Sequence, residues 1–239
     1  KHAPLTIRKM LLIAFLLAGL LPALFVSVLS FYQARTALRT EIKHDLQTTG
    51  QAVGEHIDRV LFERVQNVRS WSQLAIMQDM QIGDIDKRLS VFLEETRLSY
   101  AAQYISIDVV DLQSVTIASS DPKHINQRLT SPPVWFSFKE DNQPITLYHL
   151  QNDQLMIATP IHSEFTLQPI GHLIATFNWS VIQDLLNHAA QHSTELALVD
   201  EHGRLLAQSR NWSQPRYNLH THIPIQSTLP IYGWEVKLN

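Results

Sequence analysis

The feature that most constrains this chain is an uncharged stretch near its N-terminus. The 25 residues 10–34, MLLIAFLLAGLLPALFVSVLSFYQA, carry no charged side chain and consist mostly of Leu, Ala, Val, Ile and Phe. About 20 such residues in a helix span the apolar core of a bilayer, which is roughly 30 Å thick. Gly19 and Pro22 are compatible with this prediction, because membrane helices tolerate both residue types. We therefore predict a transmembrane helix over residues 10–32 that contacts membrane lipid.

Charged residues beside this stretch set its orientation. Three basic residues precede it within residues 1–9, whereas the basic residues that follow are diluted by Glu41 and Asp45. By the positive-inside rule, we expect residues 1–9 to form a cytoplasmic tail and residues 33–239 to lie on the other side of the membrane. A cleavable signal peptide is the alternative, although the stretch is longer than the usual h-region of about 7–15 residues.

Composition excludes several classes of function. The 239-residue chain has 19 Lys and Arg against 22 Asp and Glu, a net charge of −3, and no Cys. Since nucleic-acid binding depends on basic surface meeting phosphate, no nucleic-acid partner is predicted. The lack of Cys excludes disulfides, thiolate catalysis and Cys-ligated metals, and is compatible with a location outside the bacterial cytoplasm. No nucleotide-binding loop occurs, and no cofactor is predicted.

A long amphipathic segment follows the apolar stretch. Between residues 33 and 80 there is no Pro, and apolar residues recur three or four positions apart, which is the helical period. We predict a stalk helix over residues 33–82. Gly50 and Gly54 are expected to be weak points where the helix bends, and two helices with a break near Gly50 are the alternative.

The rest of the sequence contains a repeat. Residues 104–120, YISIDVVDLQSVTIASS, read as two strands joined by a short turn, and residues 196–209, LALVDEHGRLLAQS, read in the same way. Two copies of one small α+β unit are implied, with helices predicted at about 84–99 and over the connector 179–192. The aligned positions are Val110 with Val199, Asp111 with Asp200, Ser114 with Gly203, Ala118 with Ala207, Ser120 with Ser209, and residues 160–163 with 224–227.

This arrangement resembles the double Cache domain, a pair of PAS-like units found outside the membrane in bacterial transmembrane receptors. Residues 118–121 and 123–126 are similar to the family's strand end and turn, although Asn126 stands where the family usually has Gly. Trp135 and Phe136 resemble its pocket motif. Residues 157–161 are similar to its fourth strand, residues 171–186 to its last strand and exit helix, and residues 232–236 to the strand that returns to the membrane.

The resemblance implies an α+β fold with two antiparallel-sheet modules after the stalk. The larger, membrane-distal module would span residues 83–178, the connector helix 179–193, and the smaller, membrane-proximal module 194–239. It also implies a bacterial inner-membrane receptor whose periplasmic part senses a small molecule and is not itself an enzyme. The expected output domain is a histidine kinase, a diguanylate cyclase or a chemotaxis transducer, which we expect after a second membrane helix beyond Asn239. A parallel homodimer is the natural state of such a stalk.

Strand alternation places the predicted ligand site. In residues 104–110, Ile105, Ile107 and Val109 form one face, which we expect to pack against the stalk, and the other face would line a cavity. Trp135 and Phe136 would form a lid, because small-ligand pockets combine aromatic walls with a few polar groups; the alternative is that they belong to the core. The other candidate ligand-binding residues are Tyr104, Ser106, Asp108, Ser119 and Tyr148.

The identity of the ligand does not follow from the resemblance. Amino-acid-binding members of the family have an Arg two positions before the Trp, where this chain has Pro133, and an Asp near the end of the third strand, where it has Leu147 or Tyr148. Both charged partners of an amino acid are therefore missing. Arg128 is a candidate carboxylate clamp, because its planar guanidinium suits bidentate pairing.

Histidine pairs in the second half give two further hypotheses. His220 with His222 and His188 with His192 have the spacing of metal half-sites, but neither pair has a fixed third ligand, so no metal site is predicted. A periplasmic enzyme using these His residues is one alternative function. The other is a membrane-anchored assembly module that binds a protein partner and no small molecule.

Overall fold

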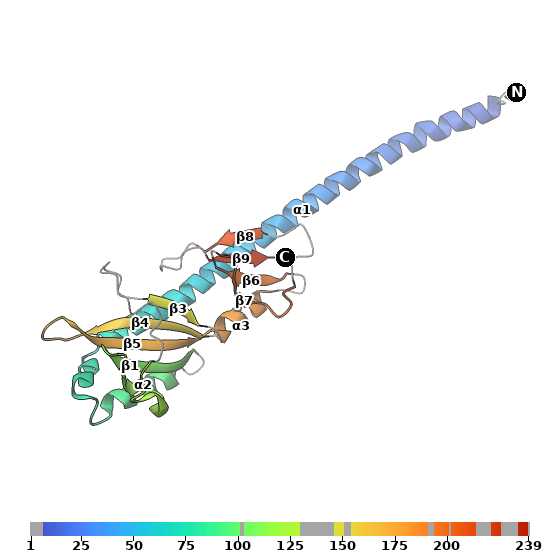
Figure 1. Cartoon of the computed structure of the whole chain (residues 1–239). Coiled ribbons are helices and arrows are strands. Elements are labelled where there is room, and N and C mark those ends of the chain that lie inside the picture. Colours follow the sequence, from blue (N-terminus) through green and yellow to red (C-terminus); the bar gives the residue numbers. More distant parts are fainter. Residues whose placement is uncertain are drawn as a thin grey trace. The chain divides into compact units, whose positions relative to one another are not determined.

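One helix dominates the N-terminal part of the structure, a computed structural model of the whole chain (Figure 1). Helix α1 (Ile7–Ser72) is continuous, and Pro22 lies inside it without ending it. The chain divides into two units, Lys1–Thr48 and Thr49–Asn239, which are described separately. The described residues are 7–100, 103–129, 146–150, 154–190, 194–200, 202–213, 221–225 and 234–238.

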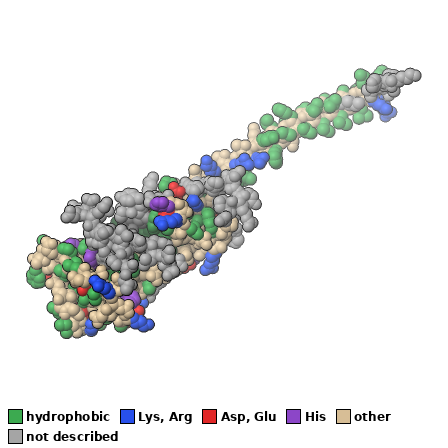
Figure 2. Space-filling model, in the orientation of Figure 1, with side chains coloured by type: hydrophobic (Ala, Val, Ile, Leu, Met, Phe, Trp, Pro, Cys, Tyr) green, Lys and Arg blue, Asp and Glu red, His purple; other side chains and the backbone are tan. Residues whose placement is uncertain are grey.

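In the first unit, the described residues form the N-terminal part of α1. Large apolar side chains from Ile7 to Tyr32 are exposed, and Figure 2 shows hydrophobic side chains along this part of the helix. α1 contains a segment that is long and apolar enough to cross a membrane. Apolar side chains on all sides of a helix are what a lipid environment accommodates.

In the second unit, α1 buries one apolar face. Val53, Ile57, Leu61, Val65 and Val68 are spaced three or four residues apart and are all buried, as the amphipathic pattern predicts. The helix ends earlier than the predicted 82. After Ser72 the amides of Gln73 and Leu74 donate to carbonyl groups three residues back, those of Ser70 and Trp71. The apolar spacing therefore continues into a 3₁₀ helix, η1 (Ala75–Ile82), instead of an α-helix.

α1 runs through Gly50 and Gly54 without a break, so the alternative of two helices separated near Gly50 is wrong. The two glycines are contact points. A Cβ on Gly50 would lie 2.4 Å from Ile223 Cδ1 and 2.6 Å from Leu238 Cδ1, whereas a Cβ on Gly54 would lie 3.5 Å or more from its neighbours. The absence of a side chain at Gly50 therefore allows α1 to approach the smaller sheet closely.

The larger sheet is antiparallel, with strand order β2-β1-β5-β4-β3. Helix α2 (Arg88–Ser99) contacts β1 and β2. Its N-terminus is capped by Asp84, whose fully buried carboxylate accepts hydrogen bonds from the Leu89 and Ser90 amides at 2.9 and 3.0 Å. The strands are β1 (Tyr104–Asp111), β2 (Thr116–Ser119), β3 (Thr146–Leu150), β4 (Gln154–His162) and β5 (Pro169–Asn178).

Helix α3 (Ser180–Ala189) follows β5 and is the predicted connector. Between them, the fully buried Trp179 donates from Nε1 to the Leu206 carbonyl at 2.7 Å and meets Trp234 edge-on at 5.8 Å. The smaller sheet is also antiparallel, in the order β7-β6-β9-β8. Its strands are β6 (Leu196–Val199), β7 (Leu205–Gln208), β8 (Thr221–Pro224) and β9 (Glu235–Leu238).

The predicted repeat is present down to individual hydrogen bonds. Asp111 Oδ1 accepts from the amides of Gln113 and Val115, and in the second copy Asp200 Oδ1 accepts from His202 and Arg204. Both hairpins contain the same register shift after the pair formed with Ala118 or Ala207. The turn residues Ser114 and Gly203 both have left-handed φ angles, 64° and 75°. Two copies of one α+β unit are therefore confirmed.

Candidate functional site

The two faces of β1 do not follow the predicted alternation at its start. The pairing with β5 shifts register between Tyr104 and Ser106, and such an irregularity changes which side chains share a face. Tyr104 therefore packs edge-on against Trp71 of α1 at 5.4 Å and against Phe177 at 6.3 Å. Ile105, predicted to be buried, is 43% exposed. The prediction that Tyr104 shares a strand face with Ser106 and Asp108 is wrong, and its part in ligand binding stays a prediction.

Tyr104 instead belongs to an aromatic cluster on the side of the sheet that faces α1. Tyr100 lies 5.9 Å from its ring, and Arg64 stacks over the Tyr100 ring at 5.9 Å. Burial raises the pKa of Tyr104 to about 12, although the positive charge of Arg64 partly opposes this. The phenol is therefore neutral and stabilises the contact between α1, β1 and β5.

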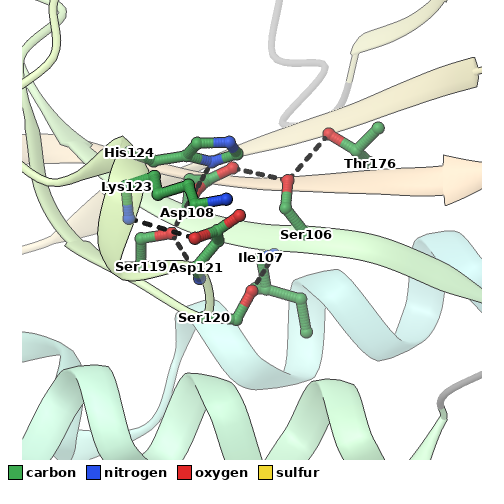
Figure 3. Close-up of polar contacts among 9 residues, drawn as sticks. All are labelled: Ser106, Ile107, Asp108, Ser119, Ser120, Asp121, Lys123, His124 and Thr176. Atoms are coloured by element: carbon green, nitrogen blue, oxygen red, sulfur yellow. Dashed lines mark hydrogen bonds and ion pairs between the residues drawn. The ribbon is translucent and has the colours of Figure 1, made fainter.

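Ser106, Asp108 and Ser119 do come together, around the Asp108 carboxylate (Figure 3). Ser119 donates to Oδ1 at 2.5 Å, Ser106 donates to Oδ2 at 2.8 Å, and all three side chains are buried. Ser106 also lies 3.3 Å from Thr176 Oγ1. Because the single Ser106 proton goes to a carboxylate that can only accept, Thr176 is the donor in that bond. The result is a row of polar groups across β2, β1 and β5.

His124 completes this network, which we call the Asp108 site: Ser106, Asp108, Ser119, His124 and Thr176. His124 ends the short helix η2 (Pro122–His124), which Asp121 caps by accepting from the Lys123 amide at 3.0 Å. Its Nδ1 lies 2.9 Å from Asp108 Oδ1. This hydrogen bond raises the pKa of His124 above 6.5, against the opposing effect of partial burial.

Apolar side chains lie beside the polar row on the same sheet. Val110, Ala158 and Ile174 form a buried cluster, with Leu129 and Met156 packed against it. Strand pairing aligns Asp108 with Ile174 and Ala158 with Ile174, so the cluster and the polar row lie on adjoining strands. A few polar groups beside an apolar floor are what a small-molecule site requires.

The chemistry of the Asp108 site suits binding better than catalysis. In a Ser-His-Asp triad the imidazole lies between the hydroxyl and the carboxylate. Here the carboxylate lies between the imidazole and the hydroxyls, so His124 has no bond to Ser119 or Ser106 through which to take a proton. Among the described residues, no three His, Asp or Glu side chains form a group that could hold a metal ion.

Comparison with known proteins identifies the fold. No family model and no curated protein matches the sequence. The ligand-binding domain of the Pseudomonas fluorescens chemoreceptor CtaA, in complex with L-isoleucine, has a TM-score of 0.61 at 16% identity, covering 87% of this chain and 95% of that one. The V. cholerae histidine kinase DctB sensor domain has a TM-score of 0.61 at 12% identity, covering 83% and 96%. The chain has the double Cache fold.

A third similar structure supports the same conclusion. The ligand-binding domain of the Campylobacter jejuni chemoreceptor Tlp3, in complex with 4-methylisoleucine, has a TM-score of 0.59 at 10% identity, covering 84% of this chain and 92% of that one. The predicted α+β architecture with two Cache modules is thus confirmed. The Asp108 site lies in the larger module, on β1, β2, β5 and η2.

The remaining candidate residues have different outcomes. Trp135 and Phe136 lie outside the described residues. Tyr148 lies in β3, where its backbone pairs with Met156. Arg128 is exposed, and its backbone forms a bridge with Val115. These four residues stay predictions.

His124 and Thr176 were not among the predicted site residues. A sequence signal existed for His124, because an Asp followed by Pro, as at Asp121 and Pro122, starts a tight turn. Such a turn directs the next residues back towards the strand that precedes it. Thr176 could be placed only once the pairing of β1 with β5 was known, because nothing in the sequence sets that register.

Proposed function

We propose that this chain is the extracytoplasmic ligand-sensing region of a bacterial membrane receptor. The observation that carries the proposal is the double Cache fold, which the chain shares over most of its length with ligand-binding domains of chemoreceptors and with a histidine kinase sensor domain. The proposed ligand is a small organic molecule. CtaA is in complex with L-isoleucine, and a Pseudomonas aeruginosa receptor of the same fold, PctC, is in complex with GABA.

The proposed ligand site is the sheet face of the larger module that carries Ser106, Asp108 and Ser119. Trp135, Phe136 and Tyr148 are proposed to enclose it, and Arg128 to approach from its edge. Burial of a carboxylate costs free energy unless it is hydrogen-bonded, and the Asp108 site supplies those bonds from three elements. Such an arrangement holds a charged acceptor in a fixed position for a ligand.

The proposed topology follows the sequence. Residues 10–32 would cross the bacterial inner membrane in contact with lipid, residues 33–239 would lie in the periplasm, and residues 83–178 and 194–239 would be the membrane-distal and membrane-proximal modules. A parallel homodimer through the stalk would carry the signal to a kinase, cyclase or chemotaxis output. A ligand acts through such a device only by binding one arrangement of the stalk more tightly than another.

Thermal unfolding of the full chain in lipid nanodiscs, with a panel of amino acids, amines and organic acids, tests the proposal. A true ligand at about 100 times its Kd stabilises the folded state by about 2.7 kcal/mol, and the Asp108→Asn variant should lose this gain. Asp184→Asn, a matched change at an exposed position of α3, should keep it. If no compound stabilises the chain, the assembly-module alternative takes the place of this proposal.

A further inference from the structure

The Asp108 carboxylate already holds a cationic group supplied by the protein itself. A carboxylate has about four acceptor positions. Among the described residues, three are taken: His124 and Ser119 occupy Oδ1, and Ser106 occupies Oδ2. One position on Oδ2 is therefore available to a further donor. While His124 is protonated, the pair is electrically neutral, and a second cation at Oδ2 would meet the positive charge of the imidazolium at close range.

Resting on the proposed function, we propose that His124 determines which ligands the site accepts. Protonated His124 fills the role of a ligand's ammonium group on Asp108, so primary amines and protons compete for the site. When the imidazole is neutral, Asp108 carries an uncompensated negative charge. The ammonium group of a primary amine then binds at Oδ2 and neutralises that charge.

The surroundings of His124 favour this role. Its side chain is 41% exposed, whereas that of Asp108 is 12% exposed, so protons reach the imidazole directly from the solvent. Of the described charged groups near it, Asp108 on β1 and Asp121 at the start of η2 both favour the protonated form. Lys123 on η2 is exposed. Ser119 on β2 and Thr176 on β5 carry no charge, so the two carboxylates govern the titration.

Linkage fixes the direction of the effect. The hydrogen bond to Asp108 raises the pKa of His124 above 6.5, so the imidazolium predominates below that pKa and is lost above it. If protons and amines compete, amine affinity falls tenfold for each pH unit below the His124 pKa and is constant above it. By reciprocity, a bound amine must lower the His124 pKa.

The test uses n-butylammonium as probe and n-butanol as its uncharged control, with the full chain in nanodiscs. NMR signals of the His124 ring report both its titration and probe binding at about pH 5.5 and pH 8. We expect tighter probe binding at the higher pH, a lower His124 pKa when the probe is bound, and no effect of n-butanol.

Two variants separate the proposed role from a purely structural one, and thermal unfolding shows whether each is folded. His124→Gln keeps a donor to Asp108 but cannot titrate, so probe affinity, measured by calorimetry, should be high and independent of pH. Asp108→Asn should not bind the probe at either pH. Binding that does not change with pH in the unmodified chain, or a pH dependence that survives in His124→Gln, would overturn the inference. A probe that binds neither the unmodified chain nor His124→Gln would also overturn the inference.

These outcomes are distinct from failure of the proposed function. A metabolite that stabilises the chain equally at both pH values, and equally in His124→Gln, would leave the sensing function in place and remove the role of His124. A metabolite screen without any hit refutes the sensing function, whatever the probe does.

Discussion

Replacing each glycine of α1 by alanine should have opposite effects, although the two lie one turn apart on the same helix. In a helix interior, alanine is about 0.8–1.0 kcal/mol more favourable than glycine, and the contacts of a new methyl group add part of the roughly 0.8 kcal/mol that full burial of such a group is worth. At Gly54 the new Cβ would be 3.5 Å from Ile225 Cγ1 and 3.9 Å from Val236 Cγ2, which are ordinary contacts. We expect Gly54→Ala to stabilise the chain by about 1–1.5 kcal/mol.

At Gly50 the same methyl group would overlap two side chains. Carbon atoms at rest lie about 3.5–4.0 Å apart, whereas the new Cβ would be 2.4 Å from Ile223 Cδ1 and 2.6 Å from Leu238 Cδ1. Both side chains, or the sheet that carries them, would have to move. Overpacking of this kind costs about 1–3 kcal/mol and offsets the helical gain. We expect Gly50→Ala to destabilise by about 1 kcal/mol, so that the two variants differ by about 2 kcal/mol.

Urea unfolding of both variants measures this difference, and a third variant tests its cause. Ile223→Val removes the Cδ1 atom that lies nearest to the new Cβ, so it should be less harmful in the Gly50→Ala background than alone, with a favourable coupling energy of about 0.5–1 kcal/mol. If Gly50→Ala stabilises the chain as much as Gly54→Ala does, α1 does not contact β8 and β9 at Gly50 and the reasoning is refuted.

Three further predictions concern single buried groups. Asp84→Ala should destabilise the chain by about 2–3 kcal/mol in urea unfolding, because the α2 amides lose a charged acceptor; an equal loss in Asp84→Asn would contradict the part played by charge. Gly171→Ala should cost at least about 3 kcal/mol, since its Cβ would be 2.3 Å from the Val110 carbonyl oxygen, and near-normal stability would show that β1 and β5 are further apart there. Burial lowers the pKa of His172 to about 4, so folding stability falls as pH drops from 6.5 towards 4. His172→Gln should remove about 3 kcal/mol of this loss. If the unfolding free energy of the variant and of the unmodified chain changes identically with pH, this prediction is refuted.

Patterns that repeat along the chain made much of the fold predictable. The three-to-four spacing of apolar residues marks the buried face of α1 from Val53 to Val68. The matched residues of the two hairpins, such as Asp111 with Asp200, gave the duplication correctly, because the turn needs the same side-chain acceptor in both copies. Such turn hydrogen bonds involve only neighbouring residues, so they can be predicted without knowledge of the tertiary structure.

The site was less predictable, because it depends on strand register and on a chain reversal. Ser106 and Asp108 lie on one face of β1, as alternation predicts, but an irregularity in the pairing with β5 places Tyr104 on the opposite face. The end of α1 was misplaced because a 3₁₀ helix continues its apolar spacing beyond Ser72. His124 reaches Asp108 only because η2 turns back over β1. Each of these errors arises where tertiary contacts override a local period.

The two copies of the hairpin share a backbone register but differ in the residue at one central strand position. Ala197 of the smaller module holds the strand position that Asp108 holds in the larger one, since Ala197 pairs with Gln208 as Asp108 pairs with Ser119. The backbone frame is thus the same, while the carboxylate at its centre is missing. The smaller module therefore contains a folded β-hairpin of the same register that has no ionised group at the position of Asp108.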